Sequence, residues 1–162
     1  YALYPHMTVF ENMAFGLKLR KTPKDEIKRR VEEAARILDI AHLLDRKPKA
    51  LSGGQRQRMA IARAVVKKPE IYLFDDSFSA LDVKTDKTLR MRLRESMGDS
   101  TMLIVAQRVG SILDADRILV MEDGQIVGRG KHRELLHTCP LYREIAELQL
   151  GEEEVKHELE CV

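Results

Sequence analysis

The chain has 162 residues, which is enough for one domain with a usable hydrophobic core. Its formal net charge is +2 with 33% charged residues, so no large single-sign field indicates nucleic acid as a partner. No apolar run reaches the length of about 18 residues that a membrane span needs, and Cys139 and Cys161 fit no metal-ligand spacing.

The beginning of the chain carries a helical pattern. We expect one helix over residues 8–19 and a longer amphipathic helix over residues 23–40. Thr22 suits the capping position of the longer helix, and Pro23 suits its first turn, where no N–H is needed. A short helical turn over residues 42–45 is expected to follow. The longer helix repeats apolar residues at helical spacing, namely Ile27, Val31, Ala34, Ala35 and Leu38.

A glycine pair then precedes a run of good helix formers from Gln55 onward. Ser52 suits the N-cap of this helix, while Gly53 and Gly54 let backbone N–H groups come close to a ligand. A helix start also carries partial positive charge, so the combination predicts a site for a terminal phosphate. A capped helix after a turn is the simpler interpretation of the same residues.

Two carboxylates follow the next apolar run. Residues 71–74 fit a buried parallel strand, and Asp75 and Asp76 come directly after it. Open α/β sheets bind ligands at the carboxyl ends of their strands. We therefore expect Asp75 to hold Mg²⁺ and Asp76 to orient or deprotonate an attacking water. A strand that runs into an Asp-rich turn is the alternative.

The rest of the chain alternates helices and strands, which favours an α/β layer architecture. Asp123-Gly124 is a strong hairpin signal between two short strands, and the Glu-rich tail from Gly151 is expected to fray. The expected helices cover residues 83–97, 111–115, 131–136 and 141–150, and the expected strands cover residues 101–106, 117–121 and 125–130.

These segments resemble, in order, the motifs of the ABC-type ATPases. Residues 51–58, LSGGQRQR, are similar to the signature motif, and IYLFDD at residues 71–76 is similar to the Walker B strand. IVAQR at residues 104–108 resembles the switch region, and YALYPHMTV at residues 1–9 resembles the segment after the Q-loop glutamine. The D-loop of the family is matched by Ser79, Ala80, Leu81 and Asp82.

The resemblance implies an α/β fold of the P-loop NTPase type. The chain would be the distal part of such a domain, with a helical subdomain, a mostly parallel sheet with flanking helices, and a C-terminal hairpin. Residues 1–50 would form the helical subdomain, and residues 51–150 the signature helix, Walker B, D-loop and switch region. Residues 151–162 would be an acidic tail.

The resemblance also implies ATP and Mg²⁺ as cofactors, with Asp75 as the metal ligand. A second nucleotide-binding domain would pair head to tail with this chain, as a homodimer or heterodimer, and a transmembrane transporter subunit would contact it. The chain would then be cytoplasmic, peripheral at the inner face of the cell membrane, and nucleic acid is not expected. Asp82 would link the two ATP sites. The signature residues would face the partner's ATP; they are Leu51, Ser52, Gly53, Gly54 and Gln55.

The sequence departs from the family pattern at three places. It contains no G-x-x-x-x-G-K-[ST] loop and begins just after the Q-loop glutamine, which we interpret as truncation before Walker A. Asp76 stands where the catalytic Glu is usual, and a misplacement of about 1 Å can cost roughly a hundredfold in rate. Gln107 replaces the switch His and cannot carry a proton. Both catalytic positions thus resemble the degenerate site of heterodimeric exporters, and we expect the isolated chain to be inactive or very weak.

The two parts of the chain resemble different branches of the family. Up to about Arg58 the sequence is similar to maltose-type sugar importers, and from about Lys68 it is similar to heterodimeric exporters. A natural mosaic and an artificial chimera both stay open. The function that we favour is the ATP-binding subunit of an ABC transporter. A non-transport ABC ATPase and an inactive scaffold with an unpaired, self-associating sheet edge are the alternatives.

Overall fold

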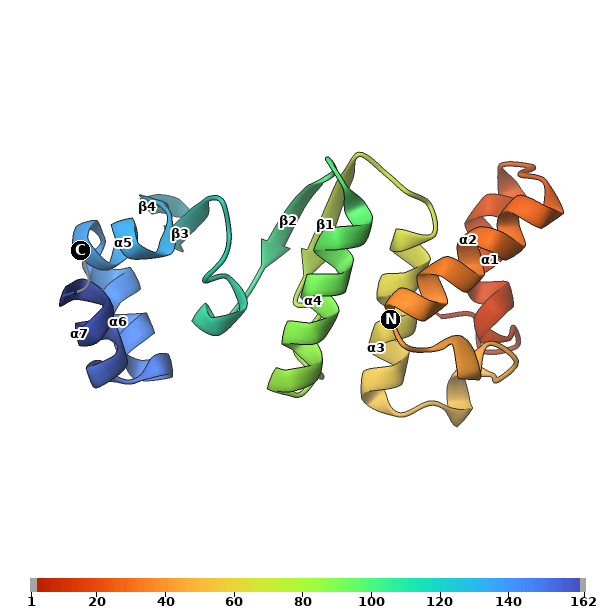
Figure 1. The fold of residues 1–162 in the computed structure, drawn as a ribbon, viewed down its shortest axis with the longest axis horizontal. Helices are drawn as coiled ribbons and strands as arrows, with labels where there is room; N and C mark the ends of the chain where they lie inside the picture. Colours follow the sequence, from red (N-terminus) through yellow and green to blue (C-terminus); the bar gives the residue numbers. More distant parts are fainter. Residues whose placement is uncertain (1–2, 161–162) are drawn as a thin grey trace. The chain divides into compact units, whose positions relative to one another are not determined.

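The computed structural model describes residues 3–160, which divide between Val105 and Ala106 into two compact units. Each unit has its own hydrophobic core and is described by itself. The order of helices and strands along the chain can be followed in Figure 1. The division into residues 1–50, 51–150 and 151–162 concerns family segments rather than compact units, and it stays a prediction.

The first unit begins with the predicted helices. Helix α1 spans Val9–Leu19, and Thr8 caps it in a reciprocal pair with Glu11. Helix α2 spans Lys24–Ile37 and has Pro23 at its N-cap without a side-chain hydrogen bond, so the prediction that Thr22 caps it was wrong. Two 3₁₀ turns, η1 at Ala41–Leu43 and η2 at Pro48–Ala50, lead to helix α3 at Gly53–Val65.

Helix α2 ends earlier than residue 40 because of a backbone reversal. Asp39 adopts the left-handed conformation with φ of 52°. The N–H of Asp39 then donates to the carbonyl of Arg36, and the N–H of Ile40 donates to the carbonyl of Ala35. These two bonds form a Schellman motif, which satisfies the last carbonyls of the helix. Ile40 itself is fully buried, so the chain turns back into the core.

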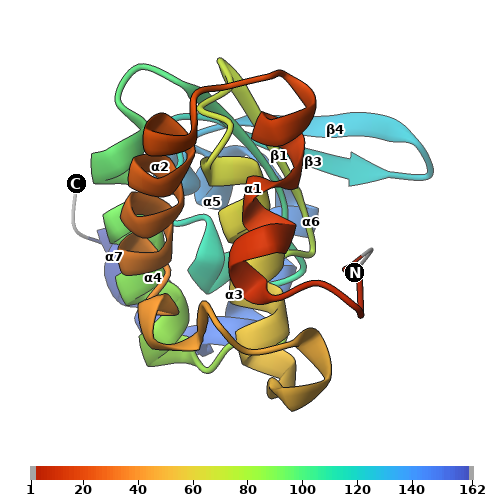
Figure 2. The same ribbon diagram turned by 90° about the vertical axis from the view of Figure 1, so that its right-hand side faces the viewer.

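A shared core joins the helices of this unit. Helices α1, α2 and α3 lie side by side, as Figure 2 shows, and they bury apolar side chains against one another. The fully buried residues include Val9, Val31 and Met59, one from each helix. None of the helices within residues 3–160 is both long and apolar enough to cross a membrane.

A two-stranded parallel sheet completes the first unit. Strand β1 at Ile71–Asp75 pairs with strand β2 at Thr101–Val105, and helix α4 at Val83–Met97 connects them (Figure 1). This confirms the predicted parallel strand order. One face of β1 faces the core, with Tyr72 and Phe74 buried, whereas Leu73 on the other face is 65% exposed. The prediction that residues 71–74 form a buried strand was therefore wrong for one face of β1, because within the described residues only the other face is covered.

The second unit contains the predicted hairpin. Strand β3 at Ile118–Glu122 pairs with strand β4 at Gln125–Gly130 in the antiparallel sense, with an irregularity between Val120 and Met121. Asp123 and Gly124 have φ of 49° and 77°, the left-handed values that a tight two-residue turn requires. The expected short helix over residues 111–115 is instead a 3₁₀ turn, η3, at Val109–Ser111.

The acidic tail is a helix, which corrects the expectation that it frays. Helix α5 spans His132–Thr138, α6 spans Pro140–Leu150, and α7 spans Glu152–Glu160. Val155 of α7 is 1% exposed in the core of this unit, and this burial holds the helix in place. The buried His132 ring lies 2.8 Å from both Tyr142 Oη and Glu158 Oε2. Burial, followed by the charge of Glu158, raises the pKa of Tyr142 to about 12.

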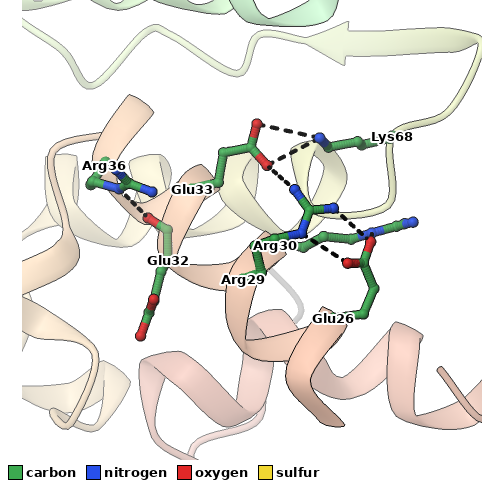
Figure 3. Close-up of polar contacts among 7 residues, drawn as sticks. All are labelled: Glu26, Arg29, Arg30, Glu32, Glu33, Arg36 and Lys68. Atoms are coloured by element: carbon green, nitrogen blue, oxygen red, sulfur yellow. Dashed lines mark hydrogen bonds and ion pairs between the residues drawn. The ribbon is translucent and has the colours of Figure 1, made fainter. Parts of the chain in front are cut away.

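Charged side chains connect α2 internally and to the end of α3, as Figure 3 shows. Glu26 accepts hydrogen bonds from Arg29 and Arg30 on its own helix. Glu33 forms an ion pair of 3.0 Å with Lys68, which follows α3. These side chains are partly to largely exposed, so each pair adds little to stability by itself. The hydrogen bonds from Arg29 and Arg30 nevertheless lower the pKa of Glu26 to about 2.

We predict a small, pH-dependent contribution of Glu26 to stability. Its pKa falls from 4.5 to about 2 on folding, so its carboxylate stabilises the native state above about pH 4.5, and this contribution is lost as the pH falls toward 2. Urea midpoints of the wild type and Glu26→Gln should therefore differ at pH 7, differ less at pH 3 and converge near pH 2. Glu32→Gln is the control, because Glu32 points away from this network in Figure 3. An unchanged difference at pH 3 would contradict the prediction.

Candidate nucleotide-interface site

The signature loop, Leu51–Gln55, is held in shape by its own side chains. The N–H of Ser52 donates to Gln55 Oε1 at 2.9 Å, and the N–H of Gln55 donates to Ser52 Oγ at 3.3 Å. This reciprocal capping confirms Ser52 as the N-cap of α3, and the helix begins at Gly53. Arg56 Nη1 also donates to the carbonyl of Leu51 at 2.6 Å. The loop is thus ordered within this chain alone.

The two glycines of the signature loop are not required by the fold of the described residues. Neither has a positive φ, so the backbone does not demand glycine at either position. A Cβ atom on Gly53 would meet nothing within 4 Å. A Cβ atom on Gly54 would lie 3.5 Å from Ala80 O and from Leu81 Cδ2, which is ordinary van der Waals contact. The absence of side chains here leaves the start of α3 uncovered.

Backbone donors point out of this uncovered helix start. The N–H of Gln55 is bonded to Ser52, whereas the N–H groups of Gly53 and Gly54 have no acceptor among residues 3–160. The first turn of α3 contains no acidic side chain that would repel an anion. A helix start with free N–H groups and partial positive charge attracts phosphate oxygens. The geometry therefore suits the phosphate site that the residues predict.

The carboxylate pair lies at the carboxyl end of β1. Asp75 ends the strand, and Asp76 leaves it with φ of 47°, a left-handed value that Asp adopts more readily than most residues. The N–H of Asp76 still donates to the carbonyl of Val105 at 3.3 Å, so the turn begins directly after the ladder. Both side chains are exposed. They are therefore accessible to a ligand from outside the chain.

The residues near Asp75 fit Mg²⁺ only in the company of other ligands. No group of three or more His, Cys, Asp or Glu side chains that could hold a metal ion occurs within residues 3–160. Mg²⁺ keeps several waters and is usually bound by one or two carboxylates together with substrate phosphates. The exposed carboxylates of Asp75 and Asp76 match that mode of binding. They would hold the ion together with a nucleotide rather than alone.

The D-loop, Ser79–Asp82, connects the carboxylates to helix α4. Leu81 is buried and fixes this loop in the core, while Ser79 and Ala80 are exposed. Asp82 is the N-cap of α4 and accepts a hydrogen bond from the N–H of Thr85 at 3.0 Å. Hydrogen bonds from Thr85 lower the pKa of Asp82, so this side chain is charged at neutral pH. Its predicted role between two ATP sites stays a prediction.

Gln57 belongs to the site, and the sequence analysis missed it. Its side chain is fully buried between α3 and the turn that carries the carboxylates. Gln57 Oε1 accepts a hydrogen bond from the N–H of Ala80 at 2.9 Å, and Nε2 donates to the carbonyl of Asp76 at 3.3 Å. The available signal was a polar residue on the apolar face of a helix, four residues before Ile61 and eight before Val65.

The remaining predicted catalytic residue belongs to the second unit. The side chain of Gln107 is exposed, and its carbonyl accepts a hydrogen bond from Gln149 Nε2 at 2.9 Å. The structure therefore brings together the signature loop, the carboxylates and the D-loop within the first unit. Gln107 is described only within its own unit, and its catalytic role stays a prediction.

Comparison with known proteins identifies relatives for this arrangement. Residues 1–79 match the family described as "ABC transporter". The ABC transporter ATP-binding protein YurJ of Bacillus subtilis is 49% identical over 140 residues, which cover 85% of this chain and 38% of YurJ. The oligosaccharide import ATP-binding protein MsmX of B. subtilis is 51% identical over 129 residues, or 78% of this chain and 35% of MsmX. The sn-glycerol-3-phosphate import ATP-binding protein UgpC of Bordetella pertussis is 49% identical over 127 residues, or 76% of this chain and 35% of UgpC.

A solved structure agrees with these sequence relatives. A bacterial Atm1-family ABC exporter with ATP bound has a TM-score of 0.80 and 32% identity to this chain, covering 93% of it and 27% of the exporter chain. The match to the import protein MsmX over 129 residues extends well past the signature helix, so these comparisons do not separate the two parts of the chain by branch. The mosaic stays a prediction. The chain spans between a third and two fifths of the length of these sequence relatives, and it belongs to the family of ABC transporter ATP-binding proteins.

Proposed function

We propose that this chain acts as part of the ATP-binding subunit of an ABC transporter and presents its signature loop to an ATP molecule held by a second nucleotide-binding domain. The observation that carries this proposal is the glycine pair. Gly53 and Gly54 are required neither by backbone conformation nor by packing, yet their lack of side chains exposes two N–H groups at a helix start. A ligand held by another molecule, which would accept hydrogen bonds from these N–H groups, explains why glycine occupies both positions.

The signature loop has the chemistry to bind a terminal phosphate. The N–H groups of Gly53 and Gly54 donate to phosphate oxygens, and the Ser52 hydroxyl has a proton to donate while its oxygen accepts from Gln55. The reciprocal capping of Ser52 and Gln55 keeps these donors in place before a ligand arrives. Binding therefore requires little reordering of the loop, which favours affinity.

The proposed cofactors are ATP and Mg²⁺. Asp75 would hold the metal ion on this chain's own side together with nucleotide phosphates, whereas the signature loop would face the ATP held by the partner, and the ion would neutralise charge on the phosphates that it binds. Asp76, one residue further along the turn, would orient a water molecule. Its side chain is one methylene shorter than the Glu usual in the family, and Gln107 cannot carry a proton, so we expect weak or no hydrolysis by this chain alone.

The proposed partners follow from the same site. A second nucleotide-binding domain that carries a G-x-x-x-x-G-K-[ST] loop would hold most of the nucleotide whose terminal phosphate the signature loop contacts. The names of MsmX and UgpC describe import ATP-binding proteins, which supports a transmembrane transporter subunit as the other partner. The chain would then lie in the cytoplasm at the inner face of the membrane.

An inactive scaffold is the second candidate function. Asp76 and Gln107 both depart from the catalytic residues of the family, and this favours a chain that keeps the family motifs without their activity. The outer face of the parallel sheet also exposes apolar side chains, which promotes self-association. These residues are Ile71, Leu73, Leu103 and Val105.

Calorimetric titration with Mg·ATP tests the proposed function. We expect no binding to the chain alone, because the signature loop contacts only the terminal phosphate. When a full-length ABC ATP-binding protein that carries G-x-x-x-x-G-K-[ST] is present, ATP should bind more tightly than it binds to that protein alone. No effect of the chain would leave the scaffold as the better interpretation. Tight binding to the chain alone would contradict the proposed division of the site.

The glycine pair gives a second prediction, in which stability and binding change differently. Gly53→Ala should leave the free energy of unfolding unchanged or raise it by up to about 1 kcal/mol, since Ala is the better helix former and the added Cβ meets nothing. The same variant should lose the partner-dependent gain in ATP affinity. Gly110→Ala is the control, because Gly110 is remote in sequence from the signature loop and its added Cβ would lie 4.0 Å from Leu150, which is ordinary van der Waals contact. If Gly53→Ala retained the full partner-dependent gain in ATP affinity, the proposal would be contradicted.

A further inference from the structure

A buried amide occupies a place on α3 where an apolar side chain would pack more simply. Gln57 is fully buried, and Ile61 and Val65 follow it one and two turns later on the same face with 3% and 6% exposure. Burying a carboxamide costs free energy unless its donor and acceptor both find partners. The contacts that Gln57 makes must therefore account for its presence.

The carboxamide of Gln57 binds both ends of one turn. Its Oε1 accepts from the N–H of Ala80 at 2.9 Å, and its Nε2 donates to the carbonyl of Asp76 at 3.3 Å, with Ser79 Oγ at 3.5 Å. These partners lie 19 to 23 residues further along the chain. A single side chain thus connects the signature helix to the carboxylate turn and to the D-loop.

The turn from Asp76 to Ala80 has few other connections to α3. Ser79 and Leu81 donate within the turn, to the carbonyls of Asp76 and Phe78, and the N–H of Asp76 donates to Val105 on β2 rather than to α3. Phe78 is held from the other side, where the Arg90 guanidinium lies 4.3 Å from the ring centre. Within the described residues, Gln57 Oε1 is the one acceptor for the Ala80 N–H.

The same contact sets the separation between the signature loop and the D-loop. Gly54 lies one turn before Gln57 on α3, and a Cβ on Gly54 would sit 3.5 Å from Ala80 O. A shift of the Asp76–Ala80 turn along α3 would break the bonds of Gln57 and also change this approach. Besides the core packing of Phe78 and Leu81, the spacing between the uncovered helix start and the exposed carboxylates therefore depends on the hydrogen bonds of Gln57.

We infer that Gln57 is a positioning residue, whose buried carboxamide holds the carboxylate turn and the D-loop in register with the signature loop. Its effect on ATP binding rests on the proposed function, whereas its effect on the turn does not. Gln57 acts through Asp76 and Ala80 and needs no contact with the nucleotide. A movement of α3 is transmitted by this side chain to both, and a movement of the turn is transmitted back to α3.

Hydrogen exchange of the Ala80 amide in the full chain tests the positioning role directly. Gln57→Met keeps the length of the side chain and removes both hydrogen-bonding groups. We expect the Ala80 amide to exchange at least about tenfold faster relative to amides in the middle of α3, the size expected for loss of one buried hydrogen bond. An unchanged relative rate in Gln57→Met would overturn the inference.

Asn12→Leu is the matched control for the loss of a buried amide. Asn12 is 1% exposed, and its side chain binds the backbone of Tyr4 and Thr8, which lie outside the carboxylate turn. This variant should lower overall stability as Gln57→Met does, yet leave the relative exchange rate of Ala80 unchanged. Equal acceleration of Ala80 in both variants would show a general loss of stability and overturn the inference.

Mg·ATP titration with the partner protein described above then separates this inference from the proposed function. Gln57→Met should reduce the partner-dependent gain in ATP affinity about tenfold, and Asn12→Leu should not. If the wild-type chain produces a gain that Gln57→Met retains in full, the inference fails while the proposed function stands. If the wild-type chain produces no gain, the proposed function fails, and the exchange of Ala80 still decides whether Gln57 positions the turn.

Discussion

The burial of one face of α3 is the constraint on which the first unit depends. Met59 and Ala62 are fully buried against the neighbouring helices, and Gln57 is fully buried against the carboxylate turn. Because α3 is packed on these sides, its N-terminus has one fixed position relative to the end of β1. The uncovered signature loop and the exposed carboxylates are consequences of that packing.

This arrangement separates what supports the fold from what is available for binding. The capping pair of Ser52 and Gln55 uses the side chains of the loop for local structure, while the glycines between them leave backbone donors free. The carboxylate of Asp82 likewise serves the fold, because it accepts the N-cap hydrogen bond of α4. A loop that is ordered before its ligand arrives loses little conformational entropy on binding. This chain's half of the proposed nucleotide site is therefore preformed, and contacts from another molecule would complete the site.

Local signals predicted much of the fold, and the failures share a cause. Helix α1 and the turn at Asp123-Gly124 follow from periodicity and turn chemistry within a few residues, and the parallel strand order follows from the alternation of strands and helices along the chain. The end of α2 was missed because Asp39, not a glycine, adopts the left-handed conformation there. Helix α7 was missed because its charge suggests a solvated tail, whereas Val155 is anchored in a core made by distant residues.

The sequence by itself determined the family, the N-cap at Ser52, and the presence of a glycine pair and two carboxylates, because each is a short pattern whose chemistry is local. Only the tertiary structure decided that these patterns come together and that Gln57 joins them. The reason is physical: the bonds of Gln57 to Asp76 and Ala80 cross about twenty residues of chain, and no local rule specifies a partner at that separation. The exposure of Leu73 was likewise decided by the tertiary structure. The same short apolar sequence can form a strand buried on both faces or on one face only, so the sequence does not distinguish the two.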